Sequence, residues 1–331
     1  MGVKIAILAE PDIQQRIFED SHWRQLADIG EVARNDQPGV PRPEILKRLL
    51  EGADYAITSW GCPTLTRDIL EVAPELKAVI HAAGTVKGIV TPDLWSRGIR
   101  VTSGNGPLGI GVAETALGMT IASLKEMWRL SQDTRNGKWD EGRGRVRELY
   151  RVTIGVIGAG KAGAHYIRLL RNFEVTILVY DPVLTAEQAE VMGAVKRGLE
   201  EVLRRSDVVS IHAPSIPETH KMFNRERLGW MKDDAILINT ARGSIVDEEA
   251  LADVLREGRL FACLDVTDPE PPAADHPLRG LPNCIITPHL AGAVNNGVKR
   301  LGQFAIDELR RMLAGEPLAG EVKEEQMSTL A

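Results

Sequence analysis

Short apolar runs alternate with amphipathic stretches along the first hundred residues. The runs at 3–8, 55–58 and 78–81 have the length and composition of buried strands. Apolar residues with helical spacing lie between them, at 45–50, 67–72 and 93–96. This alternation predicts a parallel sheet covered by helices. The glycine-rich segment 103–107 interrupts it and is a candidate hinge.

A second alternating series fills most of the remaining chain. A long apolar helical pattern at 112–135 comes first. Strands are then predicted at 152–157, 175–180, 208–212, 235–239, 261–264 and 284–287. The simplest role of a last helix, at 298–314, is to return the chain to the first domain. Two α/β domains are therefore expected, as is usual for a chain of 331 residues.

Composition and charge argue against several classes of protein. With 44% hydrophobic and 26% charged residues, the chain is typical of a globular protein. Its net charge of -6 disfavours nucleic-acid binding, because such domains are usually basic. One dense basic cluster lacks the interleaved aromatic pattern of a nucleic-acid platform, so we interpret it as a solvated or subunit-contact face. It consists of Arg143, Arg145, Arg147 and Arg151.

The cysteines and the N-terminus bear on location. Cys62, Cys263 and Cys284 are widely spaced and form no metal or redox motif, which suits a reducing cytosol. No apolar run approaches the roughly 18 residues that span a bilayer, and the chain begins directly with a strand rather than a signal peptide. We expect a cytoplasmic protein without a metal site, a membrane segment or a nucleic-acid partner.

A glycine-rich turn opens the second series. The strand at 152–157 runs into Gly158-Ala159-Gly160-Lys161-Ala162-Gly163, and a helical stretch follows. A strand before and a helix after are the context in which GxGxxG binds a dinucleotide. Gly158 permits the tight turn, Gly160 lets a pyrophosphate approach the backbone, and Gly163 lets the helix pack closely on the strand. The N-terminus of the helix that follows, at 164–170, supplies free amides that attract phosphate, and Lys161 and Ala162 within the turn are candidate cofactor contacts as well.

The next predicted strand ends at Asp181, eighteen residues after Gly163. An acidic residue there hydrogen-bonds the adenosine ribose hydroxyls and repels a 2′-phosphate. No Arg or Lys stands just beyond Asp181, so the sequence favours NAD over NADP. The alternative is a purely structural glycine turn, with an acidic helix cap after the next strand.

Three segments near the C-terminal end each place one charged or titratable side chain beside an apolar strand. They carry Arg242, Glu270 and His289. Arginine can clamp a carboxylate, histidine can exchange a proton near neutral pH, and glutamate can hold and tune the histidine. Each could be structural by itself. Together, in this order, they predict a site that polarises a carbonyl and moves a proton.

The glycine turn, the Arg-Glu-His series and the domain rhythm together resemble the D-isomer-specific 2-hydroxyacid dehydrogenases. The resemblance covers nearly the whole chain and is strongest over residues 153–292. Its specific motifs are residues 158–163 with Asp181, Asn239-Thr240-Ala241-Arg242-Gly243, Asp247-Glu248-Glu249-Ala250-Leu251, Leu264-Asp265-Val266 and Thr287-Pro288-His289.

This resemblance implies an NAD-dependent oxidoreductase that transfers a hydride between the nicotinamide and a small D-2-hydroxy acid or 2-keto acid. Arg242 would orient the substrate, and Glu270 would pair with His289, which protonates the keto oxygen. Asp265 would bind the nicotinamide carboxamide. Further cofactor contacts would come from His212, Pro214, Thr240, Ala241 and Gly292.

The resemblance also implies the architecture: two doubly wound parallel-sheet α/β domains. A Rossmann NAD-binding domain, residues 106–294, would be inserted in a smaller flavodoxin-like substrate domain, residues 1–105 and 295–331. Family members are commonly dimers that exchange the long segment after residue 112, so a homodimer is expected. Because the chain stops soon after the returning helix, we expect no regulatory domain.

Substrate contacts are expected on loops of the first domain. The family binds the substrate carboxylate on amides of a glycine-rich loop, here Ala83-Gly84-Thr85, so Gly84 and Thr85 could form a small anion nest. Trp60 follows a strand at its carboxyl end, where ligands bind in such sheets, and could cover an apolar substrate group or simply pack in its loop. Ala83 replaces a family glycine and Lys87 a family aspartate, so the acid is not identified.

Two other functions are compatible with the fold. Formate and phosphite oxidation are disfavoured, because formate enzymes carry Gln where Glu270 stands and phosphite enzymes carry Lys where Ala83 stands. An NAD(H)-sensing, corepressor-like binding protein with little turnover is the alternative of a different class. Such relatives retain the Arg-Glu-His set, so turnover has to be measured.

Overall fold

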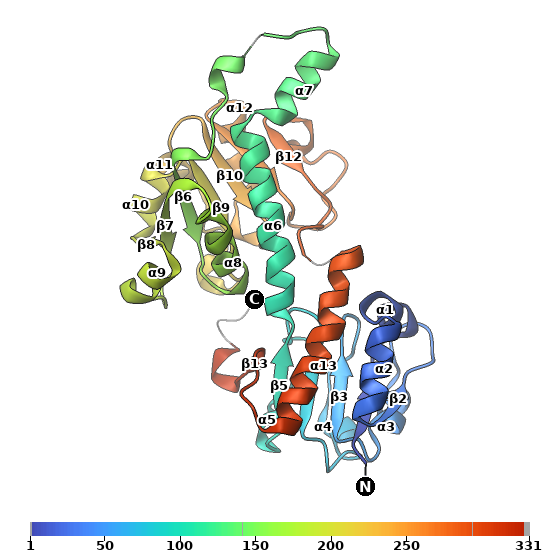
Figure 1. The fold of residues 1–331 in the computed structure, drawn as a ribbon. Helices are drawn as coiled ribbons and strands as arrows, with labels where there is room; N and C mark the ends of the chain where they lie inside the picture. Colours follow the sequence, from blue (N-terminus) through green and yellow to red (C-terminus); the bar gives the residue numbers. More distant parts are fainter. Residues whose placement is uncertain (1, 141, 293, 328–331) are drawn as a thin grey trace. The chain divides into compact units, whose positions relative to one another are not determined.

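The computed structural model describes residues 2–140, 142–292 and 294–327. The chain divides into two compact units. Unit 1 comprises Met1–Leu108 with Ala293–Ala331, and unit 2 comprises Gly109–Gly292. Each unit contains one sheet with helices on both faces (Figure 1).

The sheet of unit 1 has the strand order β13-β5-β4-β3-β1-β2. Its strands are β1 (Lys4–Ile7), β2 (Glu31–Arg34), β3 (Tyr55–Thr58), β4 (Ala78–His81), β5 (Arg100–Ser103) and β13 (Glu321–Val322). All neighbours pair in parallel except β13 with β5. The parallel order 2-1-3-4-5 is that of the flavodoxin-like fold.

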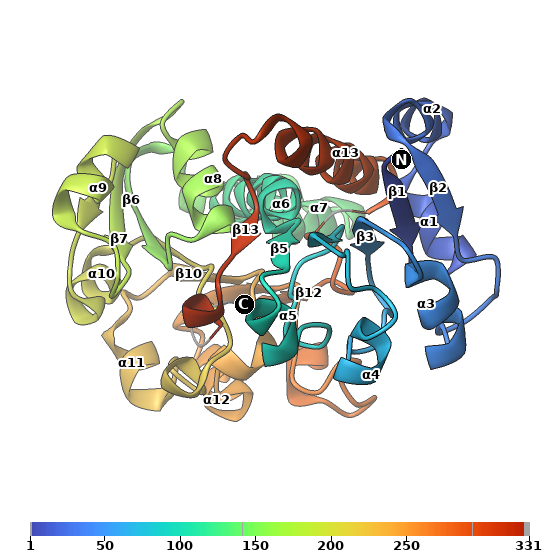
Figure 2. The same cartoon turned by 90° about the horizontal axis from the view of Figure 1, so that it is seen from below.

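Helices cover both faces of this sheet (Figure 2). One face packs on α3 (Pro43–Leu50), α4 (Arg67–Leu70) and α5 (Pro92–Ser96). The other packs on α1 (Pro11–Ile17), α2 (Asp20–Ile29) and α13 (Lys299–Ala314). The last long helix therefore belongs to the core of the unit that contains the N-terminus.

A buried carboxylate on α13 binds the segment that leads into β13. Glu308 is fully buried, and its two oxygens accept hydrogen bonds from the amides of Ala319 and Gly320, each at 3.0 Å. Arg311 Nη1 lies 3.1 Å from the same carboxylate. These bonds hold the segment that leads into β13.

Unit 2 has the strand order β12-β11-β10-β9-β6-β7-β8, entirely parallel. Its strands are β6 (Tyr150–Ile157), β7 (Glu174–Tyr180), β8 (Val195–Lys196), β9 (Val208–Ile211), β10 (Ala235–Asn239), β11 (Leu260–Leu264) and β12 (Cys284–Ile286). Numbered within the unit, the order is 3-2-1-4-5-6-7, the doubly wound Rossmann order with one added strand. The predicted fold class is thus the observed one.

The helices of unit 2 also form two layers. One face packs on α10 (Leu199–Arg205), α11 (Arg225–Trp230) and α12 (Glu248–Arg256). The other packs on α6 (Asn105–Leu124), α8 (Lys161–Leu170) and α9 (Ala186–Met192). Helix α7 (Met127–Arg135) follows α6 and buries none of its residues.

Helix α6 differs from the prediction at both ends. It begins at Asn105, inside the segment expected to be a hinge, and it ends at Leu124, before Glu126 with a φ of 54°. Two of its glycines lie in close contact with other segments of unit 2. A Cβ at Gly109 would lie 2.9 Å from the Ala162 nitrogen, and one at Gly111 would lie 3.1 Å from the Gly292 oxygen. Packing therefore outweighs the low helix propensity of glycine here.

By length and composition, α6 could also cross a membrane, and it is the one such helix among the described residues. We expected none, because no continuous apolar run approaches roughly 18 residues. The mean hydropathy of its most apolar window is 1.3, and 39% of that window is buried within the chain. Ala113, Ala116 and Leu124 belong to the core of unit 2, as residues of a core helix do.

We predict that Glu308→Ala destabilises unit 1 by about 2 kcal/mol, because two amides and an arginine lose a buried charged partner. The measurement is the urea dependence of far-UV circular dichroism. Glu316→Ala, an exposed glutamate in the same segment, is the control and should change stability by less than about 0.5 kcal/mol. Equal stability of the two variants would contradict the anchoring role of Glu308.

Candidate active site

The predicted site residues of unit 2 follow the carboxyl ends of its strands. The glycine turn follows β6, His212 follows β9, Thr240 follows β10, Asp265 follows β11 and His289 comes after β12. Parallel strands present these ends at one edge of the sheet. The strand order reverses between β6 and β9, which is where α/β sheets of this kind bind ligands.

The three glycines of the turn have different surroundings. Gly158 has a φ of 90°, and a Cβ there would lie 2.8 Å from the Ala213 nitrogen. A Cβ at Gly163 would lie 2.1 Å from the Gly158 oxygen, so the start of α8 touches the turn directly. At Gly160 a Cβ would meet no described atom within 4 Å. This open space, beside the unpaired first amides of α8, fits a pyrophosphate.

Asp181 lies directly beside the turn. Its Oδ2 accepts a hydrogen bond from the amide of Ala159 at 2.8 Å. Its Oδ1 accepts from the amides of Val183 and Leu184 at 2.9 and 3.1 Å. The carboxylate therefore connects the glycine turn to the loop after β7. Its contact with the adenosine ribose remains a prediction.

His212 lies against the glycine turn. Its Nε2 lies 2.9 Å from Ser210 Oγ, and its ring centroid lies 5.1 Å from that of Tyr166 on α8. Burial lowers the pKa of His212 to about 3, so the ring is neutral. Its Nδ1 is buried without a partner among the described residues. Pro214 accepts a hydrogen bond from Thr219 Oγ1 at 2.6 Å.

The loop that carries Arg242 is fixed by Asn239, to which the sequence assigned no role. The Asn239 amide donates to the Arg242 carbonyl at 2.8 Å, and its oxygen accepts from the Ala241 amide at 3.0 Å. The exposed guanidinium donates to the Ala241 carbonyl at 2.7 Å and forms no ion pair with any described residue. It therefore remains available to a carboxylate. Thr240 Oγ1 is buried without a partner among the described residues.

The loops after β10 and β11 touch at Gly243. A Cβ at this position would lie 2.1 Å from the carbonyl carbon of Thr267. No side chain fits there, so the backbone carrying Arg242 lies directly against the segment that leads to Glu270. This close approach brings Arg242 and Glu270 onto neighbouring loops.

Asp265 is almost fully buried at the end of β11. Its Oδ1 accepts hydrogen bonds from Thr287 Oγ1 at 2.6 Å and from the Leu290 amide at 2.9 Å, and its Oδ2 accepts from the Ala291 amide at 2.7 Å. The carboxylate thus holds the segment around His289. The predicted carboxamide contact would add to these bonds and is untested.

His289 and Glu270 form the predicted pair. His289 Nδ1 lies 2.7 Å from Glu270 Oε2. Because a carboxylate only accepts, Nδ1 carries the proton, and Nε2 is the ring atom left to face a substrate. The His289 side chain is 51% exposed, so a ligand can reach it. Its φ is 50°, and its amide donates to the Asp265 carbonyl at 2.9 Å.

The sequence did not reveal a second histidine–glutamate pair beside this loop. His276 Nε2 lies 2.9 Å from Glu248 Oε2, and Glu248 Oε1 accepts from the Asp268 amide at 3.1 Å. Burial raises the pKa of Glu248. The pair lines a cavity of about 250 Å³ and braces the loop containing Glu270. Glu248 lay in a recognised motif, but no spacing connected it with His276.

The predicted substrate residues Trp60, Gly84 and Thr85 belong to unit 1. They follow the carboxyl ends of β3 and β4. Trp60 is half-buried, and the Arg16 guanidinium carbon lies 5.7 Å from its ring centroid. Gly84 is half-buried and Thr85 is exposed. These residues lie on neighbouring loops of one sheet edge, while Arg242, Glu270 and His289 lie in unit 2.

Comparison with known proteins identifies relatives. Residues 117–291 match the NAD-binding domain of the D-isomer-specific 2-hydroxyacid dehydrogenases, in agreement with the predicted cofactor. A glyoxylate reductase from Thermofilum pendens is 35% identical over 93% of this chain and 93% of its own length. A D-3-phosphoglycerate dehydrogenase from Methanocaldococcus jannaschii is 33% identical over 88% of this chain.

The chain spans only about half the length of the D-3-phosphoglycerate dehydrogenases it matches, 55% for the Methanocaldococcus jannaschii protein. Among solved structures, a phosphoglycerate oxidoreductase from Rhizobium etli has the same fold, with a TM-score of 0.85 and 26% identity. That alignment covers 98% of this chain and 99% of the other.

We predict that two glycine substitutions in the turn affect different properties, one NADH affinity and the other thermal stability. In Gly160→Ala the added methyl group enters the open space, so NADH affinity should fall at least about tenfold while the melting temperature stays unchanged. In Gly163→Ala the methyl group meets the Gly158 oxygen, so the melting temperature should fall by several degrees. Fluorescence titration with NADH and differential scanning fluorimetry measure the two effects. Undiminished NADH binding by Gly160→Ala would refute this assignment of the phosphate site.

Proposed function

The chain belongs to the family of D-isomer-specific 2-hydroxyacid dehydrogenases, and we propose that it is an NAD-dependent enzyme that interconverts a small 2-keto acid and its D-2-hydroxy acid. The observation that carries this proposal is the 2.7 Å contact between His289 and Glu270. It lies at the sheet edge that also holds the glycine turn, with Arg242 on the adjoining loop.

The residues divide the chemistry among them. When bound, NADH supplies a hydride to the carbonyl carbon of the keto acid. Arg242 binds and orients the substrate and stabilises negative charge that develops on its oxygen. His289 delivers a proton to that oxygen from Nε2, because Nδ1 is engaged with Glu270. Glu270 stabilises the charged imidazolium and fixes the orientation of the ring.

The substrate class follows from two observations. Arg242 has no ion-pair partner among the described residues and bonds only the Ala241 carbonyl, so its guanidinium can bind a carboxylate. We propose in addition that the amides of Gly84 and Thr85 in unit 1 provide a small anion site and that Trp60, on the neighbouring loop, covers an apolar substrate group. The similar proteins are called glyoxylate reductase and D-3-phosphoglycerate dehydrogenase, and each name contains that of a small acid.

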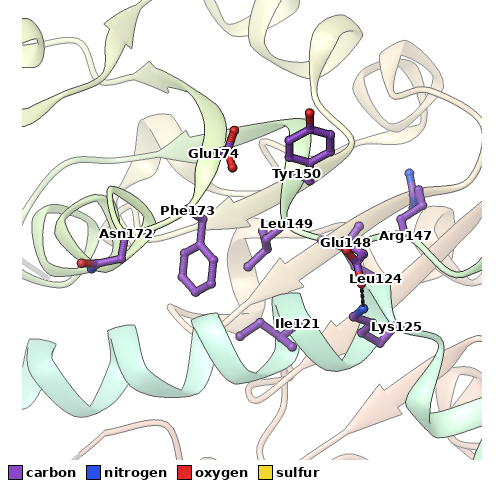
Figure 3. Close-up of a pocket in the computed structure, with 10 residues that line it drawn as sticks. All are labelled: Ile121, Leu124, Lys125, Arg147, Glu148, Leu149, Tyr150, Asn172, Phe173 and Glu174. Atoms are coloured by element: carbon purple, nitrogen blue, oxygen red, sulfur yellow. Dashed lines mark hydrogen bonds and ion pairs between the residues drawn. The ribbon is translucent and has the colours of Figure 1, made fainter.

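A homodimer is the second part of the proposal. Helix α7 buries none of its residues, and Met127 and Trp139 are 56% and 73% exposed. A cavity of about 410 Å³ lies at the end of α6 (Figure 3). Its apolar lining comes from Ile121, Leu124, Leu149, Tyr150 and Phe173. A second copy of the chain that covers α7, Trp139 and this cavity would remove their exposed apolar area from water.

A cytoplasmic location is the third part. Cys62, Cys263 and Cys284 are free thiols. Burial raises the pKa of each to about 12, which keeps them protonated and unreactive. Thiols in this state suit a reducing compartment.

We expect the protein to oxidise NADH in the presence of 2-keto acids such as glyoxylate or hydroxypyruvate. His289→Ala should lower kcat by about 10²–10⁴-fold and leave the Kd for NADH nearly unchanged, because the proton donor is lost and the cofactor site is intact. Steady-state absorbance at 340 nm and NADH fluorescence measure the two quantities. His220→Ala, an exposed histidine outside the site, is the control.

Two outcomes would contradict this assignment. If the unmodified protein binds NADH tightly but reduces none of the acids, it is a sensor or corepressor-like protein rather than a dehydrogenase. If His289→Ala loses NADH binding and turnover equally, His289 is structural.

We expect the protein to sediment at twice its chain mass at micromolar concentration. The double variant Met127→Asp/Trp139→Asp should sediment as a monomer, because two carboxylates would have to be buried in the contact. Val191→Asp replaces an exposed apolar residue on α9, outside this surface, and should remain dimeric. A monomeric unmodified protein would refute the dimer.

A further inference from the structure

We propose that His81 is a positioning residue that turns the amides of Gly84 and Thr85 toward the substrate carboxylate by tying their loop to the end of β3. The inference rests on the proposed function, in which this loop binds the carboxylate of a 2-keto acid. All residues concerned belong to unit 1.

His81 joins two loops at the carboxyl edge of the sheet. It is the last residue of β4 and pairs in register with Thr58, the last residue of β3. Its Nδ1 lies 3.0 Å from Thr58 Oγ1, and its ring also hydrogen-bonds the backbone of Thr85. Thr58 comes two residues before Trp60. One buried ring therefore connects the two loops expected to meet the substrate.

The carbonyl groups of the loop all bond inward. Ser59 Oγ donates to the Ala82 carbonyl at 2.9 Å, and the Gly104 amide donates to the Ala83 carbonyl at 2.8 Å. Ser103 Oγ donates to the Gly84 carbonyl at 2.5 Å. Burial lowers the pKa of His81, and its hydrogen bond to the Thr85 backbone opposes that shift, so the ring donates this bond and the Thr85 carbonyl accepts it.

The amides consequently face outward. In a trans peptide the carbonyl and the following N–H point in opposite directions. Inward carbonyls at Ala83 and Gly84 therefore direct the N–H groups of Gly84 and Thr85 away from the sheet. Neither amide has an acceptor among the described residues. Two adjacent unpaired amides, held by bonds on their other side, form a preorganised anion site.

A neutral histidine meets the requirements at this position. Burial lowers the pKa of His81 to about 4, so at neutral pH the ring has one donor and one acceptor. The donor serves the Thr85 carbonyl, and the acceptor receives the Thr58 hydroxyl proton. An apolar side chain of similar volume would fill the space and leave both partners unpaired.

Two variants test the proposal. His81→Met keeps the volume and removes both hydrogen bonds, and Thr58→Val keeps the shape and removes one. For glyoxylate or hydroxypyruvate, KM should rise about tenfold in His81→Met and about threefold in Thr58→Val. We expect kcat to change by less than about threefold, because the lost interaction binds substrate and transition state alike. His81→Gln, which can both donate and accept, should recover part of the KM.

A space-filling role would give a different result. Unchanged KM in both variants, with a lowered melting temperature in His81→Met, would overturn the proposal. If His81→Met does not fold, Thr58→Val decides: a KM equal to that of the unmodified protein refutes the positioning role. The Kd for NADH should stay the same in every variant, because NADH binds to unit 2.

Failure of the proposed function would be recognised separately. If the unmodified protein reduces neither acid, calorimetric binding of oxalate to the NADH-loaded protein replaces KM. Oxalate binding that is weakened in His81→Met and Thr58→Val would support the positioning role without turnover. Equal oxalate affinity in all three proteins, or no binding to the unmodified protein, would overturn it.

Discussion

The candidate active site of unit 2 depends on the hydrogen bonds of one buried carboxylate, that of Asp265. The carboxylate accepts three hydrogen bonds from the segment that follows β12. The backbone carbonyl of Asp265 accepts a fourth, from the amide of His289. His289 sits in the left-handed region with a φ of 50°, a conformation that costs a non-glycine residue about 1–2 kcal/mol. The bonds to Asp265 hold this conformation and thereby aim the imidazole at Glu270. Without them, three donors would be left unpaired in the interior.

Close backbone contacts then set the distances between the functional loops. Gly243 lets the loop with Arg242 rest on the loop with Glu270, and Gly163 lets α8 rest on the glycine turn. No residue with a Cβ fits at either point. Asn239 and Asp181 complete these contacts by pairing backbone groups that the turns leave free. The functional side chains are thus held by close backbone contacts together with hydrogen bonds from buried polar side chains.

The parts of the fold that the sequence predicted well are those in which one local property decides the structure. Strands β3, β4 and β10 have the predicted bounds because both of their faces are buried, which makes them short continuous apolar runs. The edge strand β2, with the polar sequence Glu31–Arg34, was missed because nothing in it alternates clearly. The start of α6 was taken for a hinge because glycine usually breaks helices, and the close packing of Gly109 and Gly111 could not be foreseen from the sequence.

In the candidate site, too, the features decided by local sequence were the ones predicted. Its charged residues were recognisable from motifs, and the pairing of His289 with Glu270 was inferred from their chemistry. The partners of His81 and the Glu248–His276 pair were not foreseeable, because they depend on strand register and burial. No pattern of neighbouring residues in the sequence indicates these contacts.

If Asp181 sets the cofactor preference as proposed, that preference is tied to folding. The carboxylate that would repel a 2′-phosphate is also the acceptor for three amides. Replacing it to admit NADP would therefore loosen the glycine turn on which any dinucleotide rests. A redesign for NADP is better begun at Val183, which is 78% exposed on the same loop, by adding an arginine while Asp181 stays. Selection for a new cofactor would face the same constraint, since the first viable changes lie around the aspartate and not at it.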